Sequence, residues 1–293
     1  MERKNGDHQP GDEHDHGLQE VPVDIAEALL PLLTAHGGSA RMCGWVLAGG
    51  RGRAPFPDGN PWGLRDEADP IRAFVRLWGG VEQEFPTFVA ELGRDLAGIA
   101  MLRVADDYLL AYLFARPNPL LPYGDEPGRS IAADPPLLVF GYPPRRFPDS
   151  LSVGAWDRPV PAPIRVPAAV HGRMTSEHGT IELDMFEETL RDVLLEWDRD
   201  DGEEDGEITS GSDDMYSRLI CIGEHSNGWV TVLILDEVAP DGTPLVAYYD
   251  QDGLGGVRMP FREWFDIRAV RHLVGRSPDR GRGLCVDGTG TAT

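Results

Sequence analysis

Two short turn signals divide residues 216–250 into three apolar runs of strand length, and this spacing constrains the fold more than any other feature. The runs are YSRLICIG (216–223), WVTVLILD (229–236) and LVAYYD (245–250), separated by EHSNG and PDGT. Asn-Gly and Asp-Gly pairs tolerate positive φ and are the strongest short signals for a β-hairpin. The pattern predicts a three-stranded antiparallel meander, with Gly223 supplying a bulge or bend at the end of the first strand.

The first turn also carries a glutamate, a histidine and a serine, which raises the question of catalysis. Glu224, His225 and Ser226 are consecutive, so their side chains diverge and do not form a triad with one another. The flanking glycines lack the GxSxG spacing of a nucleophile elbow. A Cys221–His225 dyad is disfavoured because Cys221 lies in an apolar strand. We predict no catalytic, cofactor-binding or metal-ligating residues, and a protein that is not an enzyme.

Helical patterns flank the meander. Residues 183–198 carry the clearest amphipathic pattern of the chain, and residues 260–272 carry a second one. The apolar positions are Leu183, Phe186, Leu190, Val193, Leu194 and Trp197 in the first, and Phe261, Trp264 and Ile267 in the second. Strands beside helices predict an α+β fold, with a mainly antiparallel sheet and helices packed against it.

The N-terminal half shows the same mixture of patterns. Asp24 and Asp69-Pro70 are typical of helix starts, and Gly79-Gly80 separates two helical patterns. The expected faces are Ile25, Leu29, Leu32 and Leu33; Ile71, Phe74, Val75 and Trp78; and Phe85, Phe88, Val89, Leu92 and Leu96. Strands are expected at 42–49 and 137–142, and a loop at 50–66. Residues 100–104 and 108–114 predict a hairpin, with a helix as the open alternative.

Composition and patterning divide the chain into four parts. Residues 1–20 are polar and acidic, which predicts a disordered tail. Residues 21–157 form an N-terminal α+β region of uncertain type, and residues 158–275 form a second α+β domain. Residues 276–293 are rich in glycine and arginine and predict a flexible tail.

The charge balance restricts the class of partner. The chain of 293 residues has 49 acids against 27 bases, a formal net charge of −22 and a pI near 4.6. A field of this sign repels nucleic acid and anionic lipid and favours a basic protein partner, although solubility alone also accounts for it. The sequence leaves the oligomeric state open.

The cysteines and the termini indicate the compartment. Cys43, Cys221 and Cys285 are odd in number and lack CxxC spacing, which fits a reducing cytosol. The charged N-terminus predicts that it is not a signal peptide, and the run VTVLIL is too short to span a bilayer. We expect a cytoplasmic protein that makes no membrane contact.

The acidic stretch after residue 198 is the candidate partner-binding segment. An EF-hand loop set at Asp201 places Ser212 at position twelve, where calcium needs a bidentate glutamate, so a calcium site is disfavoured. Either a solvated loop or a surface for a basic partner explains the stretch. The predicted partner-binding residues are Asp198, Asp200, Asp201, Glu203, Glu204, Asp205, Glu207, Asp213 and Asp214.

The tryptophans and two histidines have structural interpretations. Trp45, Trp78, Trp197, Trp229 and Trp264 lie in apolar runs and are expected in the core. His171 and His178 are seven residues apart and are expected at a helix surface or a helix end.

The order of elements after residue 158 resembles the SUKH superfamily, the Smi/Knr-like proteins. The matching features are Arg165-Val166-Pro167 leading a helix to His178-Gly179, then Ile220-Cys221-Ile222-Gly223, Asn227-Gly228-Trp229, and Pro260-Phe261 with Trp264. In that family the last element is a helix that begins with an aromatic F-x-x-W pattern. The acidic insertion before the first strand departs from the family, and the resemblance does not extend to residues before 158.

The resemblance implies a function. Many SUKH proteins are immunity proteins that neutralise polymorphic toxins, nucleases among them, by protein–protein contact. A basic toxin domain presents a cationic surface, which an acidic protein can cover. A regulatory or scaffolding role of the Smi/Knr-like type, and a hydrolase with a dispersed site, are the alternatives.

Overall fold

The computed structural model describes residues 40–117, 136–147, 151–153, 156–184, 213–225, 229–250 and 253–274. Within these ranges the N-terminal elements are β1 (Ala40–Leu47), η1 (Ala48–Gly50), β2 (Arg53–Ala54), α2 (Pro70–Trp78), α3 (Pro86–Gly93), β3 (Leu96–Val104), β4 (Asp107–Pro117) and β5 (Pro136–Gly141). The following elements are β6 (Leu151–Val153), β7 (Trp156–Arg158), α4 (Ala162–Ala168), β8 (Arg173–Ser176), β9 (Gly179–Glu182), α6 (Asp213–Tyr216), β10 (Leu219–His225), β11 (Val230–Val238), β12 (Pro244–Asp250), β13 (Gly253–Leu254), β14 (Met259–Pro260), α7 (Phe261–Glu263), the π-helical η3 (Trp264–Ala269) and α8 (Val270–Val274).

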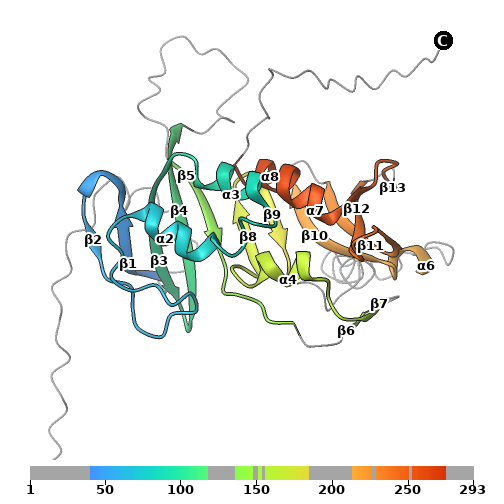
Figure 1. Ribbon diagram of the computed structural model, residues 1–293, viewed down its shortest axis with the longest axis horizontal. Helices are drawn as coiled ribbons and strands as arrows, with labels where there is room; N and C mark the ends of the chain where they lie inside the picture. The colour runs from blue at the N-terminus through green and yellow to red at the C-terminus, as the bar shows by residue number, and fades with distance from the viewer. Residues whose placement is uncertain are drawn as a thin grey trace, which may run out of the picture.

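Twelve strands form one antiparallel sheet, in the order β13-β12-β11-β10-β9-β8-β5-β4-β3-β1-β2, with β14 paired to β12. The helices α2, α3, α4, α7 and α8 lie over one face of this sheet (Figure 1). The α+β class and the antiparallel sheet predicted from the sequence are therefore confirmed. The likeness to the SUKH fold stays a prediction.

A single apolar core fills the space between the sheet and its helices. It extends from Val46 in β1 to Val274 in α8. Two smaller clusters occupy the opposite face, one on β1, β3 and β4 and one on β10, β11 and β12. β5 pairs with β8 through Phe140 and Thr175, so the sheet continues across residue 158. The division of the chain at that residue remains a prediction.

The meander β10-β11-β12 is confirmed. Both pairings are antiparallel, and the register of β10 against β11 shifts between Cys221 and Gly223, which is the bulge expected at that glycine. The second turn is also confirmed, because Gly242 has φ +83° and the N–H of Thr243 donates to Asp241. Asn227 and Gly228 lie outside the described residues.

The helix start at Asp69-Pro70 is confirmed, but its predicted buried face is partly wrong. The carboxylate of Asp69 accepts a hydrogen bond from the N–H of Arg72 and caps α2. Phe74 and Trp78 are buried, whereas Ile71 is 48% and Val75 58% exposed. The buried face of α2 also includes Pro70 and Ala73, and it packs against β3 and α3.

The other N-terminal predictions that fall within the described residues hold with small corrections. Residues 100–104 and 108–114 form the antiparallel hairpin β3-β4, which excludes the helical alternative. The strands expected at 42–49 and 137–142 are β1 and β5. Leu96 begins β3 rather than ending α3, and the expected loop 50–66 contains the short strand β2.

The predicted helix from Arg165 to His178 is wrong. The helix α4 ends at Ala168, and the hairpin β8-β9 follows, so that His178 lies in its turn. Proline at 167 removes a backbone donor, and the alternation of buried Met174 with half-buried Thr175 is a strand pattern. Val170 and Met174 are four residues apart, which is a helical spacing, but both lie after the end of α4.

The C-terminal helix is confirmed as α7, η3 and α8, with one face corrected. Phe261 and Trp264 are fully buried as predicted, but Ile267 is 39% exposed and Phe265 is buried in its place. The π-helical turn of η3 has more residues per turn than an α-helix, so an i, i+3 pattern drifts off the core.

The expectation for the tryptophans and histidines is corrected at three positions. Trp45, Trp78 and Trp264 are buried, but Trp229 is 45% exposed at the start of β11. His171 and His178 are buried rather than on a helix surface. Trp197 lies outside the described residues, as do the terminal segments 1–20 and 276–293, the helix expected after Asp24, and all of the helix expected at 183–198 except its first two residues.

A buried hydrogen-bond network at the β5-β8 junction explains the burial of His171. Nδ1 of His171 lies 2.8 Å from the carbonyl oxygen of Tyr142, so it carries the proton and donates. Nε2 is then an acceptor for the hydroxyl of Tyr112 at 2.6 Å, and that oxygen accepts from the indole N–H of Trp78 at 3.1 Å. Burial lowers the pKa of His171 to about 4 and raises the pKa of Tyr112. All three polar side chains are thus satisfied in the core.

Candidate functional site

The acidic residues predicted to bind a partner lie almost entirely outside the described residues. Asp213 and Asp214 form the first turn of α6, but their side chains are not among those that the structure places. The hypothesis that the stretch from Asp198 to Asp214 contacts a partner therefore remains a prediction.

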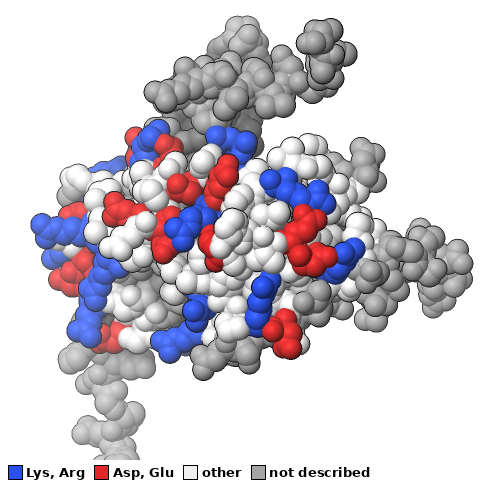
Figure 2. Space-filling model, turned by 45° about the vertical axis from the view of Figure 1, so that its right-hand side comes forward, with Lys and Arg blue, Asp and Glu red and all other residues white. Residues whose placement is uncertain are grey.

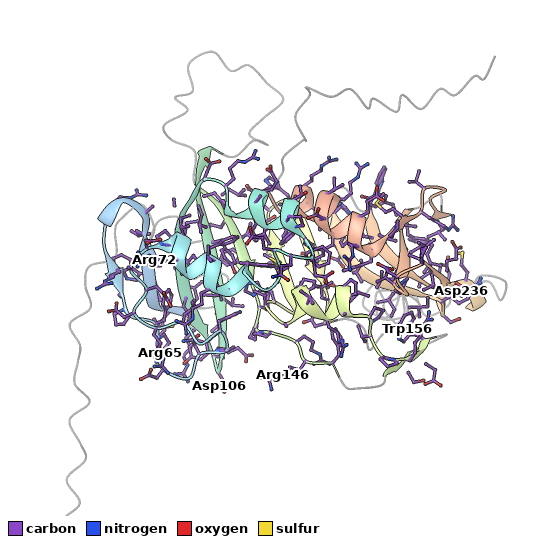
Figure 3. All side chains as sticks on the ribbon, in the orientation of Figure 1. Arg65, Arg72, Asp106, Arg146, Trp156 and Asp236 are labelled. Atoms are coloured by element: carbon purple, nitrogen blue, oxygen red, sulfur yellow. The ribbon has the colours of Figure 1, made fainter. Side chains whose placement is uncertain are left out.

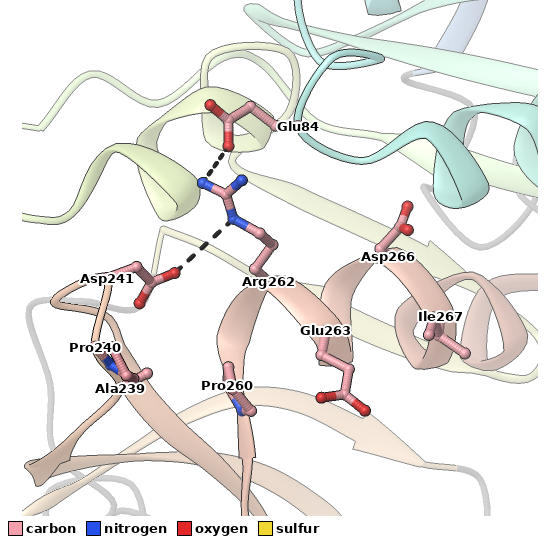
Figure 4. Close-up of a pocket in the computed structure, with 9 residues that line it drawn as sticks. All are labelled: Glu84, Ala239, Pro240, Asp241, Pro260, Arg262, Glu263, Asp266 and Ile267. Atoms are coloured by element: carbon pink, nitrogen blue, oxygen red, sulfur yellow. Dashed lines mark ion pairs between the residues drawn. The ribbon is translucent and has the colours of Figure 1, made fainter.

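A groove of about 400 Å³ lies beside the start of the C-terminal helix (Figure 4). Its lining combines four carboxylates and one arginine with an apolar floor and rim. The lining residues are Glu84, Ala239, Pro240, Asp241, Pro260, Arg262, Glu263, Asp266 and Ile267. Three segments that are distant in the sequence meet here, namely the turn before α3, the β11-β12 turn and the α7-η3 helix.

Arg262 is held between two carboxylates at the inner end of the groove. Its Nη2 lies 2.6 Å from Oε2 of Glu84, and its Nε lies 3.8 Å from Oδ2 of Asp241. Figure 4 shows the guanidinium extended between these two side chains. The single positive charge of the groove is therefore already paired, which leaves an excess of negative charge in the groove lining.

Asp266 has a structural role on one side of the groove. Its Oδ1 accepts a hydrogen bond of 2.9 Å from the backbone N–H of Phe88, in the first turn of α3. The N-cap residue of α3 is Phe85, which has no side-chain acceptor, so Asp266 satisfies an N-terminal donor from another helix. A carboxylate at a helix N-terminus also opposes the positive end of the helix dipole.

An aromatic cluster makes the wall between α3 and η3 rigid. The ring of Phe265 lies 4.9 Å from that of Phe85 and 4.4 Å from that of Phe88. Phe261 stacks on Phe265 at 5.6 Å. These rings are fully buried and close-packed. The packing holds the backbone that carries Glu263 and Asp266 in a fixed position against α3.

Asp241 is ionised in the turn between β11 and β12. Burial by itself raises its pKa, but hydrogen bonds from the hydroxyl and the N–H of Thr243, with the charge of Arg262, outweigh that effect and lower the pKa. The hydroxyl of Thr243 donates at 2.6 Å and is itself buried. This carboxylate therefore stays charged down to acidic pH.

Glu263 and Ile267 are the lining side chains left for a ligand. Both are exposed on the helix, and Figure 4 shows them following one another along it. Within the described part of the chain Glu263 forms no ion pair. A carboxylate beside an exposed isoleucine fits a segment that carries a cation next to an apolar side chain.

The charge of the described surface sharpens this interpretation. The described residues contain nearly as many arginines as acids, so most of the net charge of −22 belongs to segments outside them. Basic and acidic side chains are interspersed over the visible face, with no extended region of one sign (Figure 2). The groove is thus a local concentration of negative charge on a described surface whose positive and negative charges nearly cancel.

The catalytic alternatives do not assemble among the described residues. Cys221 packs in the cluster on the face opposite the helices, whereas His225 contacts His272 of α8, so the two do not form a dyad. Burial raises the pKa of Cys221 to about 12 and that of Cys43 to about 11, which keeps both thiols protonated. No group of three or more His, Cys, Asp or Glu residues in the described ranges is placed to hold a metal ion.

Comparison with known proteins adds no relative. No family model, no curated protein and no solved structure matches the chain. None of the helices in the described ranges combines the length and apolarity that a membrane crossing needs.

Sequence reasoning missed the groove. Its carboxylates are separated by more than 150 residues between Glu84 and Asp241, and only tertiary packing brings them together. The one available signal was the pair Glu263 and Asp266 on the helix that the F-x-x-W pattern had identified.

Proposed function

We propose that the protein is a non-catalytic binding protein that captures a basic segment of a protein partner in the acidic groove. The observation that supports this most directly is the groove itself, which is lined by four carboxylates and by one arginine that two of them already pair. Carboxylates along a concave surface focus the field and raise the association rate of a cationic partner. The adjacent Ile267 offers the apolar contact that lowers the dissociation rate.

The resemblance to the SUKH superfamily makes an immunity protein the most specific form of this proposal. The partner is then a basic toxin domain, for example a nuclease, whose cationic surface is occupied by contact alone. This form requires no catalytic residue, cofactor or metal in the binding protein. A regulatory or scaffolding role uses the same surface with a different basic partner.

The test is capture of the partner by the full chain, followed by binding measurements with variants. Glu263→Arg with Ile267→Asp replaces the exposed carboxylate of the groove by a cation and removes the apolar contact of Ile267, without touching the paired Arg262. The matched control is Asp106→Arg with Val75→Asp, which makes the same changes at exposed positions away from the groove (Figure 3). Asp106 is labelled there on the N-terminal half.

We expect the captured partner to bind the parent and the control with equal affinity. We expect it to bind the groove variant at least about tenfold more weakly, since a buried interface position contributes more than ~1 kcal/mol. A captured partner that binds the groove variant as tightly as the parent contradicts the proposal. Binding of an acidic partner at the groove contradicts it as well.

A further inference from the structure

A second surface of opposite character lies where His272 of α8 meets His225 of β10 and Tyr248 of β12. We call it the aromatic–basic patch. It consists of Trp229, Tyr248, His225, His272, Arg268 and Arg271, none of which lines the acidic groove.

The bulge in β10 creates this patch. Before the bulge Cys221 pairs with Val232, and after it Gly223 pairs with Thr231 and Glu224 with Val230. The side chain of Val230 belongs to the cluster opposite the helices, so Glu224 faces that side and His225 faces the helices. Without the extra residue, the alternation of a strand would exchange these two side chains.

The imidazole of His225 is fixed in this position. Its Nε2 lies 2.8 Å from the hydroxyl of Thr231, which is fully buried. Its ring meets that of His272 at 3.9 Å and a perpendicular angle. A Cβ added at Gly223 would lie 2.7 Å from the carbonyl oxygen of Thr180, so glycine is required for the bulge at this point.

Aromatic side chains continue the patch outward to solvent. Tyr248 lies edge-on to His225, with ring centroids 5.6 Å apart, and its hydroxyl is 3.5 Å from Nε2 of His272. Trp229 packs against Tyr248 at 6.3 Å and is 45% exposed. An exposed indole on a rigid aromatic base is the kind of side chain that dominates protein interfaces.

Two arginines supply the charge of the patch. Arg268 is exposed and Arg271 is half-buried, and neither forms an ion pair with a carboxylate in the described part of the chain. Burial and then the charge of Arg268 lower the pKa of Arg271. Burial, followed by His225 and the two arginines, lowers the pKa of His272 to about 3. The imidazoles of His225 and His272 are therefore neutral at neutral pH. The positive charges of Arg268 and Arg271 repel each other, and an anion bound between them would relieve this repulsion.

We propose that the aromatic–basic patch is a docking surface for an acidic segment of a protein partner, with carboxylates on Arg268 and Arg271 and an apolar side chain on Trp229. Arginine presents a planar fork of donors that matches a carboxylate, and two neighbouring forks favour two carboxylates in one segment. Nucleic acid fits less well, because a polyanion is attracted by many cations and the chain as a whole is strongly acidic.

This surface does not depend on the groove. Ile267 separates the two along the helix, with Glu263 and Asp266 on one side and Arg268 and Arg271 on the other. In Figure 2 a group of basic side chains borders directly on a group of acidic ones on the half of the molecule that carries the C-terminal elements. A partner that covers both surfaces presents basic and acidic segments side by side.

The test uses the full chain and a short synthetic peptide of glutamate, aspartate and phenylalanine, with binding followed by tryptophan fluorescence and calorimetry. A peptide with Gln and Asn in place of the acids, and an oligothymidylate of equal charge, serve as competing ligands. The variant Arg268→Gln with Arg271→Gln removes both cations, and Trp229→Ala removes the aromatic contact. The control Arg65→Gln with Arg146→Gln removes two exposed arginines elsewhere, both labelled in Figure 3.

The acidic peptide is expected to bind the parent and the control equally, to bind the double arginine variant about tenfold more weakly, and to lose affinity with Trp229→Ala. The groove variant Glu263→Arg with Ile267→Asp retains the acidic peptide, which separates this proposal from the proposed function. No saturable binding to the parent, equal binding of the neutral peptide, or equal affinity of the arginine variant overturns the proposal. Tighter binding of the oligothymidylate that is lost in the arginine variant overturns it in favour of nucleic acid. Dimerisation that depends on the two arginines overturns it in favour of a second copy.

Discussion

The hydroxyl of Tyr112 lies 2.6 Å from Nε2 of His171 and joins β4 to the segment that leads into β8. The same oxygen accepts the indole N–H of Trp78 from α2. One hydroxyl thus connects the N-terminal helices to the part of the chain that carries the meander. Gly141 makes room for this contact, because a Cβ there would overlap the imidazole of His171.

Replacing this hydroxyl is expected to destabilise the whole chain. Tyr112→Phe leaves Nε2 of His171 and the N–H of Trp78 buried without partners, at a cost of about 2–4 kcal/mol for two orphaned groups. Urea denaturation measures the change, and Tyr108→Phe at a half-buried position is the control. An unchanged midpoint for Tyr112→Phe contradicts the network.

The same network predicts a dependence of stability on pH. The pKa of His171 is lowered to about 4 in the folded chain, against about 6.5 unfolded. Between these values the unfolded chain binds a proton that the folded chain does not, so stability falls as pH falls from 6.5 to 4, by about 3 kcal/mol for this group. The lowered pKa values of His225 and His272 act in the same direction.

The imidazole resonances of His171 give a direct measurement by NMR titration. They are expected to stay those of the neutral ring from pH 8 to about 5. His171→Gln identifies the signals. Protonation of His171 near pH 6.5 in the folded chain is the outcome that rules this prediction out.

Asp266 offers a way to separate capping from charge in the groove. Asp266→Ala removes the acceptor for the N–H of Phe88 and is expected to cost about 1 kcal/mol, the range for helix N-caps. Asp266→Asn keeps an oxygen acceptor and is expected to retain most of that stability while it removes the charge. Equal loss in both variants, measured by thermal unfolding, assigns the effect to charge rather than to capping.

The two tryptophans at 229 and 264 provide a matched pair. Trp264 is fully buried and packs against Phe261 at 5.9 Å, so Trp264→Ala is expected to cost about 3–5 kcal/mol. Trp229→Ala at an exposed position is expected to cost much less, about 0.5 kcal/mol. Denaturant midpoints for both variants check this order, and similar midpoints contradict the assignment of Trp264 to the core.

What could be predicted from the sequence follows the range of the interactions. The meander was predictable because Asp241-Gly242 and Gly223 determine the backbone conformation of a turn and a bulge only a few residues long. The boundary at Ala168 was missed because apolar spacing alone does not separate a short helix from a following strand. The joining of β5 to β8 and the groove around Arg262 depend on packing between distant segments, for which a single sequence holds no local signal. Trp229 was misplaced because an exposed aromatic in an apolar run has the same pattern as a buried one.

The acidic stretch between Asp198 and Asp214 is the remaining candidate for partner contact, and it makes a prediction distinct from that of the groove. Exposed charges at the rim of an interface act mainly on the association rate and are screened by salt. Replacing Asp200, Asp201, Glu203, Glu204 and Asp205 with Ser or Asn is expected to slow association with the basic partner and to flatten its salt dependence, while the free energy of unfolding stays nearly the same.

The groove variant Glu263→Arg with Ile267→Asp is the comparison for this measurement. The Ile267→Asp change removes a central apolar contact and should raise the dissociation rate, while the Glu263→Arg change should lower the association rate, so only the groove variant is expected to change both rate constants. Stopped-flow association at low and high salt, with dissociation measured by competition, separates them. Identical association rates for the parent and the loop variant at low salt remove the stretch from the interface. Within the described residues the groove is then the remaining candidate for attracting the partner, because the rest of that surface is nearly balanced in charge.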